Sequence, residues 1–180
     1  KGTGQGYPEF IITYKKNYDL IIVIECKSKI TKHESRNKDR YSEYAVDGVL
    51  LYSSYLSKDF DVLSIAISGE NIRELKVSHF LQLKGEKQAI QKFGDKVLPV
   101  NDYLNGYLKS PEKFRQDYLI LLDFTKQLNE KLHIHKILES QRCLLISCIL
   151  IALENPAFKS SYGSHKTPQN LATTLVQTVS

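Results

Sequence analysis

The chain has 180 residues, of which 42% are hydrophobic and 25% are charged, and its net charge at pH 7 is +5. This balance is typical of a globular protein and excludes a generally disordered chain. The three cysteines form no pairing pattern, so we expect Cys26, Cys143 and Cys148 to be reduced and the protein to be cytoplasmic. The longest apolar stretch, residues 143–153, is too short to cross a bilayer, and no signal-peptide pattern follows Lys1.

The first part of the chain predicts a mixed α/β sheet. After a glycine-rich loop over residues 1–6, apolar patterning predicts strands at 7–14, 18–27, 61–68 and 75–83, and a helix at 42–57. Five consecutive apolar residues, Leu20 to Ile24, predict that the second strand is covered on both faces. The helix between two buried strands predicts a crossover connection and therefore a parallel pair of strands.

The last part of the chain predicts helices. They are expected at 111–135, at 139–155 and from Pro168, where Thr167 is an N-cap residue and proline the first helical residue. The second helix is apolar nearly all round, so we expect it to be deeply buried and its two cysteines to be core residues. The expected boundary divides the chain into residues 1–105 and a helical part, 106–180.

A basic block extends from Lys27 to Arg40. Six basic residues oppose two acidic ones, Glu34 and Asp39, so this stretch alone carries +4. Such a block predicts a surface that contacts phosphates, although a solvated face is the simpler alternative. The candidate DNA-binding residues are Lys29, Lys32, His33, Arg36, Lys38 and Arg40.

The residues that suggest chemistry lie on the first two predicted strands. Glu25 and Lys27 are two apart, so they share a face at the end of a buried strand, and Cys26 points the other way. Glu9, Glu25 and the carbonyl of Cys26 would form an all-oxygen site, which suits Mg²⁺ rather than zinc. Lys27 could then position a water and stabilise charge on a phosphate. The alternative is an ordinary ion pair at a strand end.

The hairpin that joins these strands decides whether the two carboxylates meet. A three-residue loop, 15–17, pairs Glu9 with Val23, which shares a face with Glu25. A four-residue loop places Glu9 on the opposite face. The site therefore predicts an odd-length loop, or an even one corrected by a bulge, with the carboxylates of Glu9 and Glu25 converging beside Lys27.

These residues carry a resemblance. Pro8-Glu9 followed by Glu25-Cys26-Lys27 at the end of an apolar strand resembles the PD-(D/E)xK nuclease motif. The longer pattern GYPEFII…DLIIVIECKSK…EYAVDGVLLY…VLSIAISG resembles the nuclease domain of fused restriction-modification enzymes. In these enzymes the nuclease domain precedes a helical region and an adenine-specific DNA methyltransferase. The stretch IHKILESQRCLLISCILIAL resembles the helical region that opens such methyltransferases.

The resemblance implies a restriction-endonuclease-like mixed sheet followed by a helical segment, and a Mg²⁺-dependent endodeoxyribonuclease of the type I or type IIG kind. Double-stranded DNA is the implied partner, with fused or associated methyltransferase and specificity regions. Glu9 and Glu25 match the two acidic metal ligands, Lys27 the catalytic lysine, and Cys26 the residue whose carbonyl binds metal. Glu9 stands where aspartate is usual. A repair or recombination nuclease and a catalytically inactive DNA-binding domain remain as alternatives.

Three further residues lie on the helix that follows the motif. Tyr44 and Tyr52 are two turns apart, and they either lie near DNA or pack on the sheet with their hydroxyls in water. We expect Asp47 to be a turn or surface residue.

Overall fold

The computed structural model describes residues 6–180, so most of the expected loop over residues 1–6 lies outside the described part of the chain. The chain divides into two compact units, which meet between Gln116 and Asp117. This boundary lies later than residue 105, because the helix α2 (Val100–Leu108) buries Tyr103 and Tyr107 in the core of the first unit.

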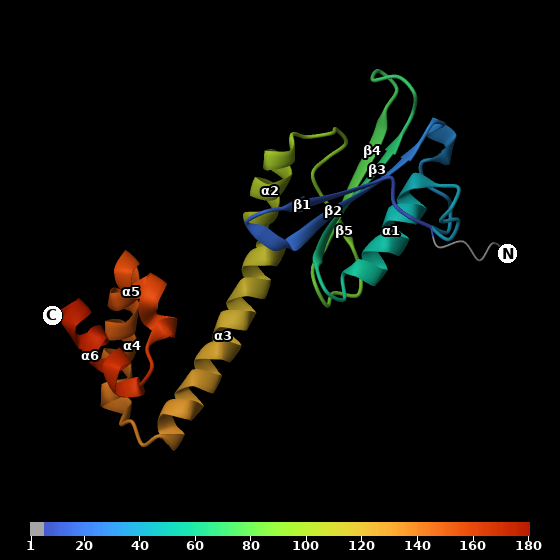
Figure 1. The fold of residues 1–180 in the computed structure, drawn as a ribbon. Helices are drawn as coiled ribbons and strands as arrows, with labels where there is room; N and C mark the ends of the chain where they lie inside the picture. Colours follow the sequence, from blue (N-terminus) through green and yellow to red (C-terminus); the bar gives the residue numbers. More distant parts are fainter. Residues whose placement is uncertain (1–5) are drawn as a thin grey trace. The chain divides into compact units, whose positions relative to one another are not determined.

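The first unit is built on a five-stranded mixed sheet whose strands follow one another in chain order (Figure 1). Its strands are β1 (Phe10–Tyr14), β2 (Asn17–Lys27), β3 (Asp61–Ser68), β4 (Lys76–Gln82) and β5 (Ile90–Gln91). β2 and β3 are parallel, and all the other neighbours are antiparallel. The predicted α/β class and the parallel pair are confirmed. The two-residue strand β5 was not predicted, since so short a strand has no periodicity.

The two faces of this sheet are covered by different helices. The helix α1 (Ala45–Leu56), which was predicted, packs against β2, β3 and β4 (Figure 1). Its Val46 and Val49 form a core with Ala66 of β3 and Phe80 of β4. The opposite face carries the larger core, in which α2 packs. On the face of the sheet that α1 covers, the helix does not reach the edge strand β1. Ile11 of β1, which lies on this face, is 57% exposed.

The second unit consists of helices. α3 (Pro111–Ile134) begins in the first unit and continues into the second, where α4 (Glu139–Glu154), α5 (Pro156–Ser161), the 3₁₀ helix η2 (Tyr162–Ser164) and α6 (Pro168–Val179) follow. Thr167 caps α6 as predicted, because its hydroxyl accepts a hydrogen bond of 3.2 Å from the N–H of Asn170.

The expected deep burial of α4 is wrong in this structure. Only Ala152 of this helix is buried, and Leu144 is 68% exposed. Of the described elements, only the short helices α5 and α6 make substantial contact with α4, so most of its surface stays open. Cys143 is exposed and Cys148 is half-buried, so neither is a core residue, although all three cysteines are free as expected.

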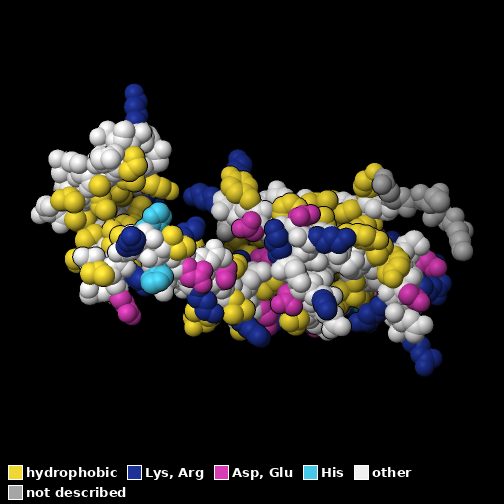
Figure 2. All heavy atoms as spheres, turned by 90° about the horizontal axis from the view of Figure 1, so that it is seen from below, with side chains coloured by type: hydrophobic (Ala, Val, Ile, Leu, Met, Phe, Trp, Pro, Cys, Tyr) yellow, Lys and Arg dark blue, Asp and Glu magenta, His cyan; other side chains and the backbone are white. Residues whose placement is uncertain are grey.

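Hydrophobic side chains gather at the surface of this helical unit (Figure 2). Among residues 6–180, no single helix is long and apolar enough to cross a membrane. The pair formed by α4 and Pro156–Ser164 is together long and apolar enough to cross a membrane, but the two helices are bent by 95° relative to each other.

Candidate active site

The end of β2 presents Glu25 and Lys27 on the face of the sheet that α1 covers. Ile21 and Val23, which precede them on the same side of the strand, pack beneath α1 against Tyr52 and Leu56. The ammonium group of Lys27 donates a hydrogen bond of 2.8 Å to Oε1 of Glu25. The Glu25 carboxylate is therefore held at the margin of the helix–sheet interface, with the ammonium group of Lys27 beside it.

The hairpin brings Glu9 to the end of β2 that carries Glu25. β1 and β2 are joined by an even, two-residue turn at Lys15 and Lys16, and the register shifts at a bulge or irregularity between Thr13 and Tyr14. Phe10, the first residue of β1, pairs with Ile24, which precedes Glu25. Glu9 lies in a bend just before β1. The even loop with a bulge was one of the two predicted solutions.

The electrostatics of two neighbouring groups agree with this placement. Burial raises the pKa of the Tyr52 hydroxyl, and the negative charges of Glu25 and Glu9 raise it further. Burial also raises the pKa of the Cys26 thiol, and the same two carboxylates add to that shift. Both carboxylates therefore act on the same two groups, as expected for a converging pair. Glu9 is exposed, whereas Glu25 is buried.

Helix α1 approaches Glu25 through a glycine. A β-carbon built on Gly48 would lie 3.3 Å from Cγ of Glu25 and 3.0 Å from the carbonyl oxygen of Tyr41. The absence of a side chain thus lets the helix, the Glu25 side chain and the loop before the helix meet at one point. Sequence reasoning missed Gly48, although a glycine in the middle of an otherwise regular helix pattern is a signal of close packing.

One oxygen of the Glu25 carboxylate has no partner among residues 6–180. Oε2 is buried and accepts no hydrogen bond from these residues, although Oε1 is paired with Lys27. Buried carboxylate oxygens in proteins are normally hydrogen-bonded or bound to a cation. This orphaned atom fits a hard cation such as Mg²⁺, for which Glu9, whose charge acts on the same two groups as that of Glu25, is the candidate second carboxylate ligand.

The carbonyl of Cys26 can supply a third oxygen. The N–H of Gly69 donates to the carbonyl of Lys27 on the β3 side, at 3.0 Å. Backbone groups of successive residues point to opposite sides of a strand, so the Cys26 carbonyl points toward β1. β1 begins at Phe10, which pairs with Ile24, so the described β1 has no residue paired with Cys26. No group of three or more His, Cys, Asp or Glu side chains that could hold a metal lies among residues 6–180. A cation here therefore depends on two carboxylates and this carbonyl.

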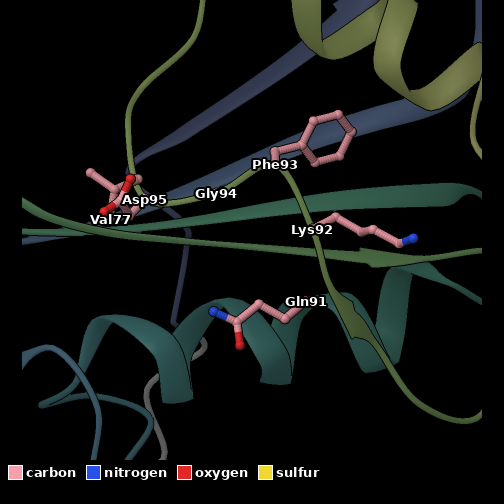
Figure 3. Close-up of a pocket in the computed structure, with 6 residues that line it drawn as sticks. All are labelled: Val77, Gln91, Lys92, Phe93, Gly94 and Asp95. Atoms are coloured by element: carbon pink, nitrogen blue, oxygen red, sulfur yellow. The ribbon is translucent and has the colours of Figure 1, made fainter.

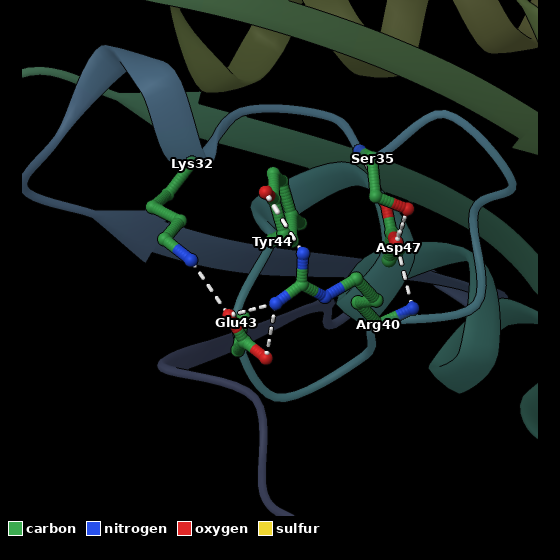
Figure 4. A network of polar contacts seen from close by, with 6 residues as sticks. All are labelled: Lys32, Ser35, Arg40, Glu43, Tyr44 and Asp47. Atoms are coloured by element: carbon green, nitrogen blue, oxygen red, sulfur yellow. Dashed lines mark hydrogen bonds and ion pairs between the residues drawn. The ribbon is translucent and has the colours of Figure 1, made fainter.

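The basic block forms a loop that a buried aspartate fastens to α1 (Figure 4). Asp47 is fully buried, which corrects its expected place at the surface. Its carboxylate accepts hydrogen bonds from the N–H of Ser35 at 3.1 Å, from the hydroxyl of Ser35, and from the N–H of Arg40 at 2.9 Å. The loop between the short 3₁₀ helix η1 (Ile30–Lys32) and α1 is thereby held in one conformation.

Several basic side chains of this loop are engaged by acidic neighbours. Glu43 binds both Lys32, at 2.6 Å, and Arg40, at 2.7 Å (Figure 4), and Glu34 binds Lys38 at 2.8 Å. The loop therefore carries less unpaired positive charge than its sequence indicates.

The remaining lysine and arginine among the candidates, Lys29 and Arg36, are exposed and have no acidic partner within residues 6–180. They are the side chains best placed to contact a phosphate.

His33 does not belong to the candidate DNA-binding surface. Its side chain is 1% exposed, with Nδ1 2.9 Å from the hydroxyl of Ser68 and Nε2 2.9 Å from that of Ser78. Burial, followed by the charge of Lys76, lowers the pKa of its imidazole. The expectation that His33 touches phosphate is corrected, because its ring joins the loop to β3 and β4 instead.

A hollow of about 360 Å³ lies elsewhere in this unit, lined by Val77 and residues 91–95 (Figure 3). The Phe93 ring points away from it and packs edge-on against Tyr103 of α2, with ring centroids 5.7 Å apart. None of the lining residues belongs to the carboxylate site, which lies at the margin between α1 and the uncovered strand β1.

Comparisons of the chain with protein-family models, curated proteins and solved structures found no match. Any functional conclusion therefore depends on the geometry of Glu9, Glu25 and Lys27 and on the motif that they form.

Proposed function

We propose that this chain is the Mg²⁺-dependent DNA-cleavage module of a restriction-modification protein and hydrolyses phosphodiester bonds. The observation that carries the proposal is the state of Glu25. The residue is 5% exposed, one carboxylate oxygen is held by Lys27, and the other is buried without a partner in the described part of the chain. An apolar or fully paired residue would suit a purely structural strand end better, because an orphaned carboxylate oxygen destabilises the fold.

In the proposed mechanism, Glu25, Glu9 and the Cys26 carbonyl would hold the cation. Bound Mg²⁺ would activate a water and offset negative charge on the phosphate. Lys27 is held by Glu25 and can donate a hydrogen bond to the phosphate as its charge grows. The oxygen of a water bonds to phosphorus and the water gives up a proton to the solvent, while one P–O ester bond breaks and its leaving oxygen takes up a proton from the solvent.

The partners in this proposal are double-stranded DNA and a methyltransferase that is fused to the module or associated with it. The loop residues Lys29 and Arg36 support the first partner, because their charges are unpaired and their loop follows Lys27 directly. The open apolar surface of α4 supports the second, since such a surface is typical of a contact with further protein.

Cleavage of supercoiled plasmid DNA in Mg²⁺ tests the proposal. We expect the wild-type protein to cut and both Glu25→Gln and Lys27→Ala to lose cutting. The thermal melt of Glu25→Gln should stay close to that of the wild type, whereas Lys27→Ala should melt at a lower temperature, because it leaves the buried Glu25 carboxylate without its partner; cutting is therefore compared at a temperature at which both variants are folded. Glu70→Gln is the matched control, because Glu70 is an exposed acid in the β3–β4 connection. Cutting by either site variant at the wild-type rate would overturn the mechanism. Wild-type protein that binds DNA but never cuts it would favour an inactive DNA-binding domain instead.

A further inference from the structure

Strand β4 has an incomplete edge at Val77. On the side of β4 where β5 lies, the carbonyl of His79 accepts a hydrogen bond of 3.0 Å from the N–H of Lys92. Backbone groups of alternate residues in a strand point to the same side, so the N–H and the carbonyl of Val77 also point to this side. Within residues 6–180 neither group has a partner there, although Val77 is only 5% exposed. Buried backbone groups are nearly always paired, so this edge lacks a neighbour.

The segment after β5 turns away from Val77. If the register of β5 continued, Gly94 would lie opposite Val77. Instead Phe93 and Gly94 have φ angles of 64° and 72°, in the left-handed region, which a strand does not use. The Gly94 carbonyl accepts a hydrogen bond of 3.0 Å from the His79 ring, and the Phe93 ring packs against Tyr103. Side-chain contacts therefore hold the segment off the β4 edge in a conformation that is costly for phenylalanine.

Two hollows follow the unpaired edge. The first, of about 360 Å³, lies between Val77 and residues 91–95 (Figure 3). The second, of about 440 Å³, lies between residues 72–75 of the β3–β4 connection and residues 95–97. Both hollows are lined by Val77 and Asp95, so they adjoin and form one groove, the Val77 groove. The unpaired groups of Val77 therefore lie beside a space that can admit a ligand.

The walls of the Val77 groove are apolar and basic. Apolar side chains come from both sides of the second hollow: Ile72, Leu75 and Val97. Arg73 and Lys96 are exposed and have no acidic partner among residues 6–180, and Lys92 is paired with Glu112 at 2.9 Å. Asp95 is the only acid that lines either hollow. The two free cations outweigh it, so the groove favours a ligand with negative charge.

The backbone groups of Val77 decide the kind of occupant. An N–H and a carbonyl side by side at a strand edge match the carbonyl and the N–H of another extended chain. A second folded copy fits less well. Val77 is nearly buried, so its edge is recessed, and the equally recessed edge of a second copy would not reach it.

We propose that the Val77 groove binds an extended, acidic segment of another polypeptide, which adds to β4 as a strand where β5 stops. Two hydrogen bonds to Val77 hold the backbone of the segment. Ile72 and Leu75 contact its apolar side chains, and Arg73 and Lys96 contact its carboxylates. The inference goes beyond the proposed cleavage and does not depend on it, because no residue of the groove belongs to the carboxylate site.

Heteronuclear NMR of the nitrogen-15-labelled chain tests the inference with a defined probe, a synthetic hexapeptide of alternating glutamate and valine. We expect the Val77 amide resonance to shift in a saturable way as the peptide is added, because its N–H gains an acceptor. Arg73→Glu combined with Lys96→Glu should weaken binding about tenfold or more, since like charges then face each other. Lys16→Glu combined with Lys87→Glu is the control, because it changes the net charge equally at exposed residues outside the groove.

Two modified peptides test the backbone pairing itself. One is N-methylated at its valines and the other at its glutamates, so each lacks the N–H donors of one edge. Only one edge of an added strand faces β4, so we expect one of the two peptides to lose binding.

Four results would overturn the inference. The first is a Val77 resonance that does not move when the hexapeptide is added. The second is a hexapeptide of alternating lysine and valine that binds as tightly as the acidic one, and the third is unchanged binding by both N-methylated peptides. The fourth is a Val77 resonance that moves with protein concentration in the absence of peptide, which would show that a second copy pairs with this edge.

Discussion

Gly48 of α1 lies so close to Glu25 of β2 that no side chain fits between them, and this limits where the candidate catalytic carboxylate can lie. A β-carbon at Gly48 would stand 3.3 Å from Cγ of Glu25. On its other side it would stand 3.0 Å from the carbonyl oxygen of Tyr41, which belongs to the backbone and cannot turn away. Any side chain here must therefore displace either the carboxylate or the loop before the helix.

The first prediction concerns this contact. Gly48→Ala should lower DNA cleavage roughly tenfold or more, because a small displacement of a catalytic group is costly to the rate. The effect on unfolding should be small, since alanine favours a helix by about 1 kcal/mol and offsets part of the crowding. Plasmid cleavage beside a thermal melt measures both. Gly163→Ala is the control, because a β-carbon at Gly163 meets nothing within 4 Å. Equal cleavage by the two variants would contradict the prediction.

The second prediction concerns Mg²⁺ binding without catalysis. If the orphaned Oε2 of Glu25 binds the cation, Mg²⁺ should raise the melting temperature of the wild-type protein in the absence of DNA. A ligand present at a hundred times its Kd stabilises the folded state by about 2.7 kcal/mol. Glu25→Gln should lose this response, and Glu70→Gln should keep it. A melting temperature that does not depend on Mg²⁺ in the wild-type protein would exclude the metal site.

The third prediction separates the unpaired cations of the basic loop from the paired ones. Neutralising Lys29 and Arg36 should reduce the slope of log affinity against log salt by roughly 0.9 for each phosphate that the protein no longer neutralises. Lys32→Gln should change the slope less, because Glu43 already engages its ammonium group at 2.6 Å. The slope is measured by titrating DNA at several salt concentrations. If the double variant keeps the wild-type slope, the loop is only a solvated face.

The fourth prediction concerns Asp47. Asp47→Ala removes a fully buried acceptor and leaves the N–H groups of Ser35 and Arg40 without it, so it should destabilise the fold by roughly 2–4 kcal/mol. Urea unfolding measures the change. Asp39→Asn is the control, because Asp39 lies in the same loop but is exposed. A destabilisation of similar size in both variants would mean that Asp47 does not hold the loop.

The fifth prediction concerns pH. Burial lowers the pKa of His33 below its usual value of 6.5, so between these two values the unfolded chain binds a proton that the folded chain does not. The contribution to stability is fully present above pH 6.5 and is lost as the pH falls toward the pKa of the folded state. His79, whose pKa is also lowered by burial, acts in the same direction. Urea unfolding over this pH range should show that the free energy of unfolding depends less steeply on pH in His33→Gln than in the wild-type protein. If the slope against pH is the same in both, the pH dependence comes from other groups.

Several elements followed from the sequence alone, because they depend on local patterns. The strand Asp61–Ser68 was predicted to the residue, and the apolar run of β2 indicated that both its faces are covered. The cap of α6 by Thr167 followed from the Thr-Pro pair. Glu25 and Lys27 had to share a face, since they are two residues apart in a strand.

Other features were decided only by the tertiary structure. The sequence limited the hairpin to two solutions, and the structure has the even turn with a register shift between Thr13 and Tyr14, which brings Glu9 to the end of β2 that carries Glu25. His33 and Asp47 look like surface residues in a charged stretch, yet contacts between the loop, α1 and the sheet bury both. The apolar pattern of α4 indicated a buried helix, but burial depends on which surfaces meet, and within the described chain few surfaces meet this one. Periodicity fixes which side chains share a face, whereas long-range pairing fixes what each face touches.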